Sequence, residues 1–203
     1  MNNFLPKILR KLEILFGIYK EEINRIRSGD MCLMGEHVRL VGNARVRNFH
    51  GKKENICIGQ NTVILGEICT FNEGAKIVVG ADTYIGPGSN IWAFESIEIG
   101  NRVQVSFGVN IHDNDSHSAS ARNRCLHVKT IMTSGHPHQV EDVGTGAIVI
   151  EDDAWIGFGS TILKGVKIGK GAIIGACSVI TKDVPEMTIV AGNPQRVVGR
   201  ARE

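Results

Sequence analysis

An isoleucine recurs every six residues through the last third of the chain, and this repeat constrains the fold more than any other feature. A small or branched residue stands four positions after each isoleucine. Neither an α-helix, with a period of 3.6, nor an alternating strand, with a period of two, has such a repeat. The isoleucines are Ile150, Ile156, Ile162, Ile168, Ile174 and Ile180, and the later residues are Ala154, Ser160, Val166, Ala172, Ser178 and Val184. The pattern predicts six-residue sides, each a short strand followed by a turn.

A longer period joins these sides into coils. Apolar pairs end at Ile58, Val79, Ile99, Ile150 and Ile168, so the successive intervals are 21, 20, 51 and 18 residues. Eighteen residues are three sides, which close a triangle, and coils of paired strands stack about 4.8 Å apart. No single coil buries enough apolar surface alone, so stacking is obligatory. The spacing predicts a parallel β-helix of about six or seven coils, with a degraded first coil at 38–42.

Composition narrows the class of protein. The 203 residues carry a formal charge of +2 with 42% hydrophobic residues, which fits one globular domain and gives no basic footprint for nucleic acid. No apolar run reaches the length of a membrane span. The cysteines are scattered and odd in number, without a metal-binding spacing: Cys32, Cys57, Cys69, Cys125 and Cys177. We therefore expect reduced thiols in a cytoplasmic protein.

Residues 1–30 differ from the rest and predict an amphipathic helix ahead of a β-helix domain at 31–198. The apolar residues fall three or four apart, which is one stripe of a helix. They are Leu5, Ile8, Leu9, Leu12, Leu15, Phe16, Tyr19, Ile23 and Ile26. This helix packs on its own domain, on a neighbouring subunit, or on a membrane surface as a peripheral contact. Three glutamates, Glu13, Glu21 and Glu22, weaken the membrane interpretation.

The 33 extra residues of the long interval form an inserted loop at about 113–147. Five of the seven histidines lie at or near it: His112, His117, His127, His136 and His138. A long loop inside a regular repeat is usually functional or disordered, and histidine exchanges protons near neutral pH. Candidate chemistry therefore belongs here.

Residues 38–198 resemble the hexapeptide-repeat acyltransferases. The tail Ile189-Val190-Ala191-Gly192-Asn193-Pro194-Gln195-Arg196-Val197-Val198 and the preceding segment 180–185 resemble the branch of maltose and galactoside acetyltransferases, which includes sugar O-acetyltransferases of surface polysaccharide synthesis. The resemblance implies an all-β, left-handed parallel β-helix and a homotrimer with acetyl-CoA bound between neighbouring subunits. Periodicity by itself supports only the fold.

The segment Asp113-Asn114-Asp115-Ser116-His117 resembles the catalytic segment of that family. The resemblance implies that His117 is the general base, which removes a proton from the acceptor hydroxyl as it attacks the thioester. Asp113 or Asp115 would hold the imidazole. His136, in a Gly-His-Pro segment, is the competing candidate. The clustered histidines also leave a zinc site open, although we expect no metal.

The resemblance also implies a set of acetyl-CoA contacts on the later coils. Small residues admit the pantetheine arm and cations meet the phosphates. These residues are Trp155, Gly157, Gly175, Ala176, Thr181, Lys182 and Arg196. Phe158 replaces the serine that galactoside-type enzymes have there. Asn90 is a candidate contact for the sugar.

The leading hypothesis is an acetyl-CoA-dependent O-acetyltransferase for a saccharide hydroxyl, in cell-surface polysaccharide or lipopolysaccharide synthesis. N-acetylation of a nucleotide-linked amino sugar is the alternative within enzymes. A zinc-dependent, carbonic anhydrase-like protein or a non-catalytic trimeric scaffold would be of another class.

Overall fold

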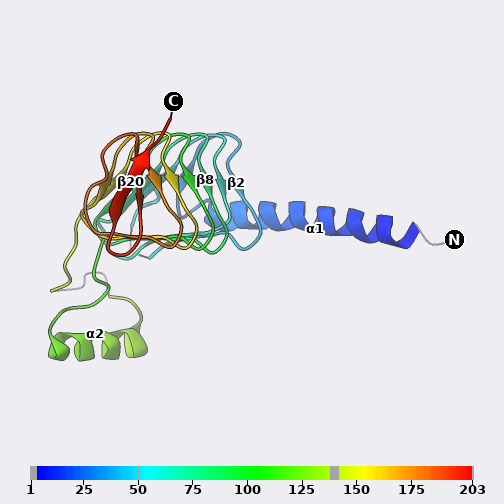
Figure 1. The fold of residues 1–203 in the computed structure, drawn as a ribbon. Coiled ribbons are helices and arrows are strands. Elements are labelled where there is room, and N and C mark those ends of the chain that lie inside the picture. The colour runs from blue at the N-terminus through cyan, green and yellow to red at the C-terminus, as the bar shows by residue number, and fades with distance from the viewer. Residues whose placement is uncertain (1–3, 50, 138–141, 203) are drawn as a thin grey trace.

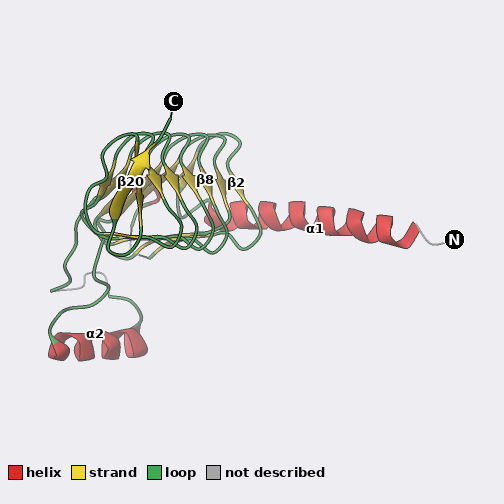
Figure 2. Ribbon diagram, in the orientation of Figure 1, coloured by secondary structure: helices red, strands yellow, loops and turns green. Residues whose placement is uncertain are grey.

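The computed structural model describes residues 4–49, 51–137 and 142–202. Three parallel sheets form the faces of a triangular prism, and the chain passes through sheets A, B and C in turn before it rises to the next coil. A helix projects from the N-terminal end of the prism and a second helix lies outside its side (Figures 1 and 2). A predominantly β architecture of stacked coils, as the repeat predicts, is confirmed.

The strands are short because each covers one side of a triangle. Sheet A contains β1 (Leu33–Met34), β4 (Ile56–Ile58), β7 (Lys76–Val79), β10 (Ser96–Ile99), β13 (Ile148–Ile150) and β16 (Lys167–Ile168). Sheet B contains β2 (Arg39–Leu40), β5 (Val63–Ile64), β8 (Tyr84–Ile85), β11 (Gln104–Val105), β14 (Trp155–Ile156), β17 (Ile173–Ile174), β19 (Thr188–Ala191) and the antiparallel β20 (Arg196–Arg200). Sheet C contains β3 (Arg45–Asn48), β6 (Glu67–Thr70), β9 (Asn90–Ala93), β12 (Asn110–His112), β15 (Thr161–Ile162) and β18 (Val179–Ile180). A 3₁₀ turn, η1 (Lys53–Asn55), precedes β4.

The strand register confirms the coil length read from the sequence. Ile58 pairs with Val79, Val79 with Ile99, and Ile99 with Ile150. All six isoleucines of the six-residue repeat are at most 1% exposed, and they stack in pairs 18 residues apart on the three inner faces of the prism. The first coil begins at Leu33, five residues earlier than the sequence suggested, because β1 already pairs with β4.

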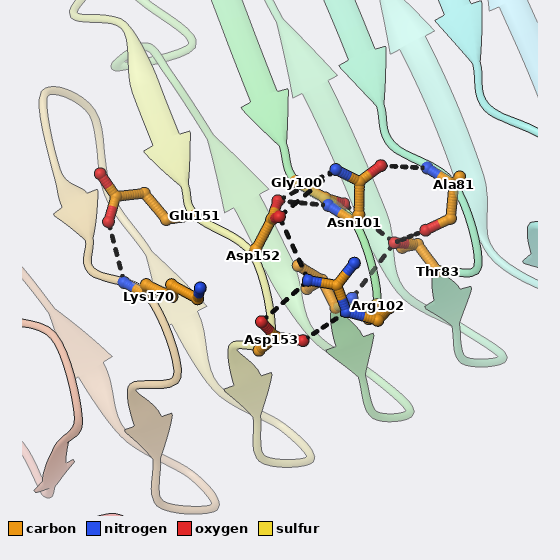
Figure 3. Close-up of polar contacts among 10 residues, drawn as sticks. Ala81, Thr83, Gly100, Asn101, Arg102, Glu151, Asp152, Asp153 and Lys170 are labelled. Carbon is orange, nitrogen blue, oxygen red and sulfur yellow. Dashed lines mark hydrogen bonds and ion pairs between the residues drawn. The ribbon is translucent and has the colours of Figure 1, made fainter. Parts of the chain in front are cut away.

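The corner between sheets A and B is held by polar groups that repeat from coil to coil (Figure 3). The Asn101 side-chain Oδ1 accepts from the backbone N–H of Ala81 at 2.8 Å, and the Asp152 carboxylate accepts from the backbone N–H of Asn101 at 2.8 Å. Arg102 adds a two-point ion pair with Asp153 on the neighbouring coil. Side chains thus satisfy backbone groups where the strand ladder is interrupted.

The N-terminal helix α1 (Phe4–Ser28) contacts the prism only near its C-terminal end, and through polar side chains. The Asn24 amide donates to the carbonyls of Leu40 and Gly42, and Glu21 accepts two bonds from Arg39. Apolar side chains from Ile8 to Tyr19 are exposed. The predicted helix is therefore present, but its apolar stripe does not pack on its own domain.

The insertion, expected as a loop, contains a helix, α2 (Ala121–Ser134). Ser120 caps its first turn, because the hydroxyl accepts from the Asn123 amide and the carbonyl from the Arg124 amide. Gly135 ends it with a φ of 83°, a conformation that glycine adopts without a Cβ clash. The helix has a weak apolar periodicity and no buried residue, which is why the sequence pattern did not predict it.

Candidate functional site

The insertion folds back over the corner between sheets C and A and encloses a pocket of about 140 Å³. Side chains from the coils form one wall, and side chains from the insertion form the other. The lining residues are Phe71, Trp92, Phe94, Asn114, Ser116, His117, His127, Ile131 and His136. This is the place where three of the histidines of the insertion come together.

The coil wall is aromatic because equivalent positions of successive coils carry phenylalanine. Phe71 stacks on Phe49 and on Phe94, with ring centroids 5.6 and 5.1 Å apart. Trp92 meets the edge of Phe71 and stacks on His112 at 5.0 Å. Aromatic pairs in these geometries add to the stability gained from burial. The wall is therefore a rigid, apolar surface fixed to the prism.

The opposite wall brings the histidines together. The Nδ1 atoms of His117 and His127 are 3.2 Å apart, so one ring donates a hydrogen bond to the other. His136 packs against Phe49 and Phe71, with centroids 5.1 and 5.3 Å apart. Both candidates for the general base therefore contact the same pocket. His138 lies outside the described residues.

Burial sets the protonation of two of these rings. The pKa of His127 is lowered mainly by burial. The neighbouring imidazoles of His117 and His136 lower it further. Burial also lowers the pKa of His112, although Asp113 opposes the shift. The Nε2 atoms of both rings and the Trp92 indole N–H are shielded from solvent and have no hydrogen-bond partner among the described residues. Of the groups that line the pocket, His127 therefore favours its neutral form and the Trp92 indole is an available N–H donor, while His112 stacks on Trp92 outside the lining.

The two acidic residues expected to hold the imidazole of His117, Asp113 and Asp115, have other partners. Asp113 is fully buried and accepts from the amides of Phe94 and Glu95, both at 2.8 Å, and burial raises its pKa. Asp115 forms an ion pair with Lys164. Within the described part of the chain the imidazole of His117 is paired with His127 instead of a carboxylate. Asp113 fixes the corner from which the insertion leaves the prism.

The residues expected to hold acetyl-CoA lie on sheet B and on the corners beside sheet C. Trp155 is half-exposed on sheet B, and its indole donates to the Ser106 hydroxyl. Gly157 and Gly175 turn the corner between sheets B and C, where a Cβ on Gly157 would lie 2.6 Å from the Ile174 carbonyl. Glycine at that position is thus required by stacking of the coils, whatever else it does. Ala176 follows at the same corner.

The remaining members of that set lie near the C-terminal hairpin. The Gln195 side chain accepts from the amides of Thr181 and Lys182 and donates back to the Lys182 carbonyl. Arg196 begins β20 and is exposed. Asn90, the candidate sugar contact, donates to the Asn110 amide carbonyl on the next coil. It lines a different hollow from the histidine pocket.

Sequence reasoning missed the aromatic wall and the role of His127. Phe49, Phe71 and Phe94 stand 22 and 23 residues apart, close to the coil length, so their alignment was detectable in principle. The contact between His117 and His127 was not, because it depends on how α2 folds back. Among the described residues no group of three or more His, Cys, Asp or Glu side chains is placed to hold a metal ion. Nor does any described helix have the length and apolar character needed to cross a bilayer.

Residues 147–182 match the family described as bacterial transferase hexapeptide (six repeats). The resemblance to hexapeptide-repeat transferases is thereby confirmed. Over 64 residues the chain is 45% identical to a 2,3,4,5-tetrahydropyridine-2,6-dicarboxylate N-acetyltransferase of Staphylococcus aureus, which is 32% of this chain and 27% of that protein. Over 78 residues it is 42% identical to a putative acetyltransferase of Saccharomyces cerevisiae, which is 36% of this chain and 40% of that one. The matched hexapeptide coils thus span well under half the length of these relatives.

Solved structures share the fold over most of the chain. AntD, an N-acyltransferase from Bacillus cereus solved as a variant with dTDP and coenzyme A, aligns over 88% of both chains with a TM-score of 0.69 and 20% identity. A hexapeptide-repeat acetyltransferase from Vibrio cholerae, solved with acetyl-CoA, covers 90% of this chain and 79% of its own, with a TM-score of 0.53 and 24% identity. The polysialic acid-specific acetyltransferase NeuO covers 84% of both chains, with a TM-score of 0.52 and 22% identity. At these identities the likeness establishes the fold alone.

Proposed function

We propose that this protein is a left-handed β-helix acetyltransferase that transfers the acetyl group of acetyl-CoA directly to a saccharide hydroxyl, in the cytoplasm, during synthesis of a cell-surface polysaccharide or lipopolysaccharide. The observation that carries the proposal is the pocket in which His117 faces an aromatic wall. Aromatic faces suit the C–H surface of a sugar ring, and imidazole suits removal of a hydroxyl proton near neutral pH.

His117 acts as the general base through Nε2. Its Nδ1 lies against His127, whose lowered pKa keeps that ring neutral. With His117 donating from Nδ1 to the Nδ1 lone pair of His127, the Nε2 of His117 carries a lone pair. That atom takes the hydroxyl proton as the oxygen attacks the thioester carbonyl, and CoA leaves as the thiol after protonation. His127 is the positioning residue, in the place where a carboxylate was expected.

A homotrimer completes the site. His117 leaves the prism at the corner between sheets C and A, whereas Gly157, Gly175 and Ala176 lie at the corner between sheets B and C. One copy therefore does not bring the base to that part of the acetyl-CoA set, whereas packing of sheet C on sheet B of a neighbouring copy would bring His117 alongside the sheet that carries Trp155. Outward residues support packing of sheet B against sheet C of the next copy. From the middle coils onward these are Tyr84, Gln104, Trp155 and Ile173 on sheet B, and Asn90, Asn110, Thr161 and Val179 on sheet C, whereas sheet A presents the charged residues Lys76, Glu98 and Lys167 together with Val78 and Val149.

The test is transfer from acetyl-CoA to a panel of sugars, followed by release of free CoA thiol. His117→Ala is expected to lower kcat by about 10²–10⁴-fold, the usual contribution of a general base. Lys129→Ala, an exposed change on the same helix as His127, is the matched control and should leave kcat unchanged. Full activity in His117→Ala would overturn the base assignment, and a loss confined to His136→Ala would transfer the role to that ring.

N-acetylation of a nucleotide-linked amino sugar is the second candidate, because AntD is an N-acyltransferase solved with a dTDP-amino sugar in a related complex. Mild alkali separates the two: an O-acetyl ester is cleaved and an N-acetyl amide is not. A product that resists alkali and forms only with amino sugars would replace the first candidate.

A further inference from the structure

The apolar stripe of α1 faces away from the prism to which the helix is attached. At about 100° per residue, eight of the ten large apolar side chains from Ile8 to Ile26 fall within about 60° of Leu12, while Ile14 and Ile18 lie about 160° and 120° from it. The residues that hold the prism, Lys20, Glu21 and Asn24, fall about 80–180° from it. In the described part of the helix the stripe consists of Ile8, Leu9, Leu12, Leu15, Phe16, Tyr19, Ile23 and Ile26.

The docking contacts are all polar and lie at the C-terminal third of the helix. Lys20 donates to Asn43 at 2.7 Å, Glu21 pairs with Arg39, and Asn24 reaches two carbonyls of the first coil. Within the stripe Leu12 is 55% and Phe16 68% exposed. Large exposed apolar surfaces on soluble proteins usually mark interaction sites. The prism orients this helix and leaves its apolar side exposed except at Ile23, which is partly buried.

The stripe has the spacing of a helical bundle. Ile8, Leu12, Leu15 and Tyr19 follow intervals of four, three and four, and Ile26 comes seven residues later. A second row at Leu9, Phe16 and Ile23 widens the apolar arc to about 120°, more than a two-stranded seam needs. Most of the stability of a helix in a protein comes from packing of its amphipathic face, so a partner on this stripe would stabilise α1.

We propose that the partner is α1 of the other copies in the homotrimer, and that the three helices form a parallel bundle around the threefold axis. The inference rests on the trimer of the proposed function. α1 runs beyond the end of the prism along the direction in which the coils stack (Figure 1). Parallel prisms therefore project three parallel helices from the same end. Three stripes that face the axis cover one another, whereas one flat bilayer cannot lie along all three.

The helix is also attached to the corner of the prism that would face the threefold axis. It contacts β2 and β3, and so lies at the corner between sheets B and C of the first coil. Packing of sheet B on sheet C of a neighbour turns this corner toward the axis. Further along the same corner, on the fourth and fifth coils, Phe107 and Phe158 form an exposed stacked pair, with centroids 4.9 Å apart. Apolar surface thus continues along the edge that the proposed trimer brings together.

Two substitutions on the full-length protein test the bundle. Leu12→Glu places a charge in the stripe, and Ile14→Glu places it on the opposite side, about 160° away. The wild-type side chains are 55% and 57% exposed, so the two changes are matched. Hydrogen exchange of the amides of residues 8–19, read by mass spectrometry, is expected to accelerate on the order of tenfold or more in Leu12→Glu only. Equal exchange in both variants would overturn the bundle.

Two further measurements distinguish failure of the helical bundle from failure of the trimer and from binding of α1 to a membrane. Sedimentation of the wild type as a trimer with fast exchange over residues 8–19 would overturn the bundle alone, whereas a monomer would overturn both the bundle and the trimer of the proposed function. Flotation with phosphatidylserine-containing vesicles provides the membrane outcome. Binding by the wild type that Leu12→Glu abolishes and Ile14→Glu keeps would replace the bundle with a lipid surface.

Discussion

The regular coils and the insertion are stabilised in different ways. Each coil repeats one solution, with a buried aliphatic residue, most often isoleucine, stacked on its equivalent in the next coil, and the strands of the inner coils paired above and below. The insertion has no buried residue in α2 and depends on a few ring contacts with the prism. Stability therefore belongs mainly to the coils, while the proposed chemistry belongs to the insertion. This separation allows the site to vary without loss of the fold.

Truncation of a stacked isoleucine is expected to have the largest effect on the stability of the protein, and it tests the contrast between coils and insertion directly. Ile156→Ala leaves a cavity at a fully buried position, and is expected to lower the free energy of unfolding by about 2–5 kcal/mol. Leu126→Ala, at a half-exposed position of α2, is expected to cost less than about 0.5 kcal/mol. Urea unfolding followed by circular dichroism measures both. A comparable loss in the two variants would show that α2 shares the stability of the coils.

A smaller effect is expected at the boundary between the two regions. Asp113→Ala removes the acceptor of the Phe94 and Glu95 amides, which are left without that bond at the corner. The expected cost is about 1–3 kcal/mol, together with a loss of activity, because Phe94 lines the pocket. Asp115→Ala breaks only a partly exposed ion pair with Lys164, which is worth about 1 kcal/mol or less.

Thermal unfolding and the acetyl-transfer assay together report on the boundary. If Asp113→Ala and Asp115→Ala have equal effects, Asp113 does not fix the corner. Asp113→Asn keeps one acceptor oxygen, and is expected to recover part of the stability.

The contrast between coils and insertion also explains which parts of the structure could be predicted from the sequence. The stack from Ile150 to Ile180 was predictable, because each coil imposes the same geometry on the same residue type and the register follows from the intervals. The start at Leu33 was missed, since β1 lacks the repeat and is defined only by pairing with β4. The pairing of His117 with His127 was also missed. It arises from a tertiary contact between the corner and α2, and ten residues of sequence separation carry no periodic signal.

The smallest effect, and the most specific to the insertion, is a dependence on pH. Burial and neighbouring imidazoles lower the pKa of His127 in the folded state. His127 therefore binds a proton more readily when the insertion is undocked than when it is docked against the prism. Docking is therefore fully retained above the ordinary histidine pKa of about 6.5, and weakens as the pH falls below it. The apolar core of the coils contains no histidine, so the folding of the coils is expected to change little over the same range.

Trp92 reports on this step, because it lines the pocket and stacks on His112. In a Trp155→Phe background, the Trp92 emission is expected to change between pH 7.5 and 5.5 while the far-ultraviolet circular dichroism stays constant. His127→Gln, which does not titrate, should reduce the change. The His112 ring, whose pKa burial also lowers, supplies whatever dependence is left. If the emission of the Trp155→Phe protein does not change with pH, the imidazoles do not control docking. The insertion would then be as insensitive to pH as the coils.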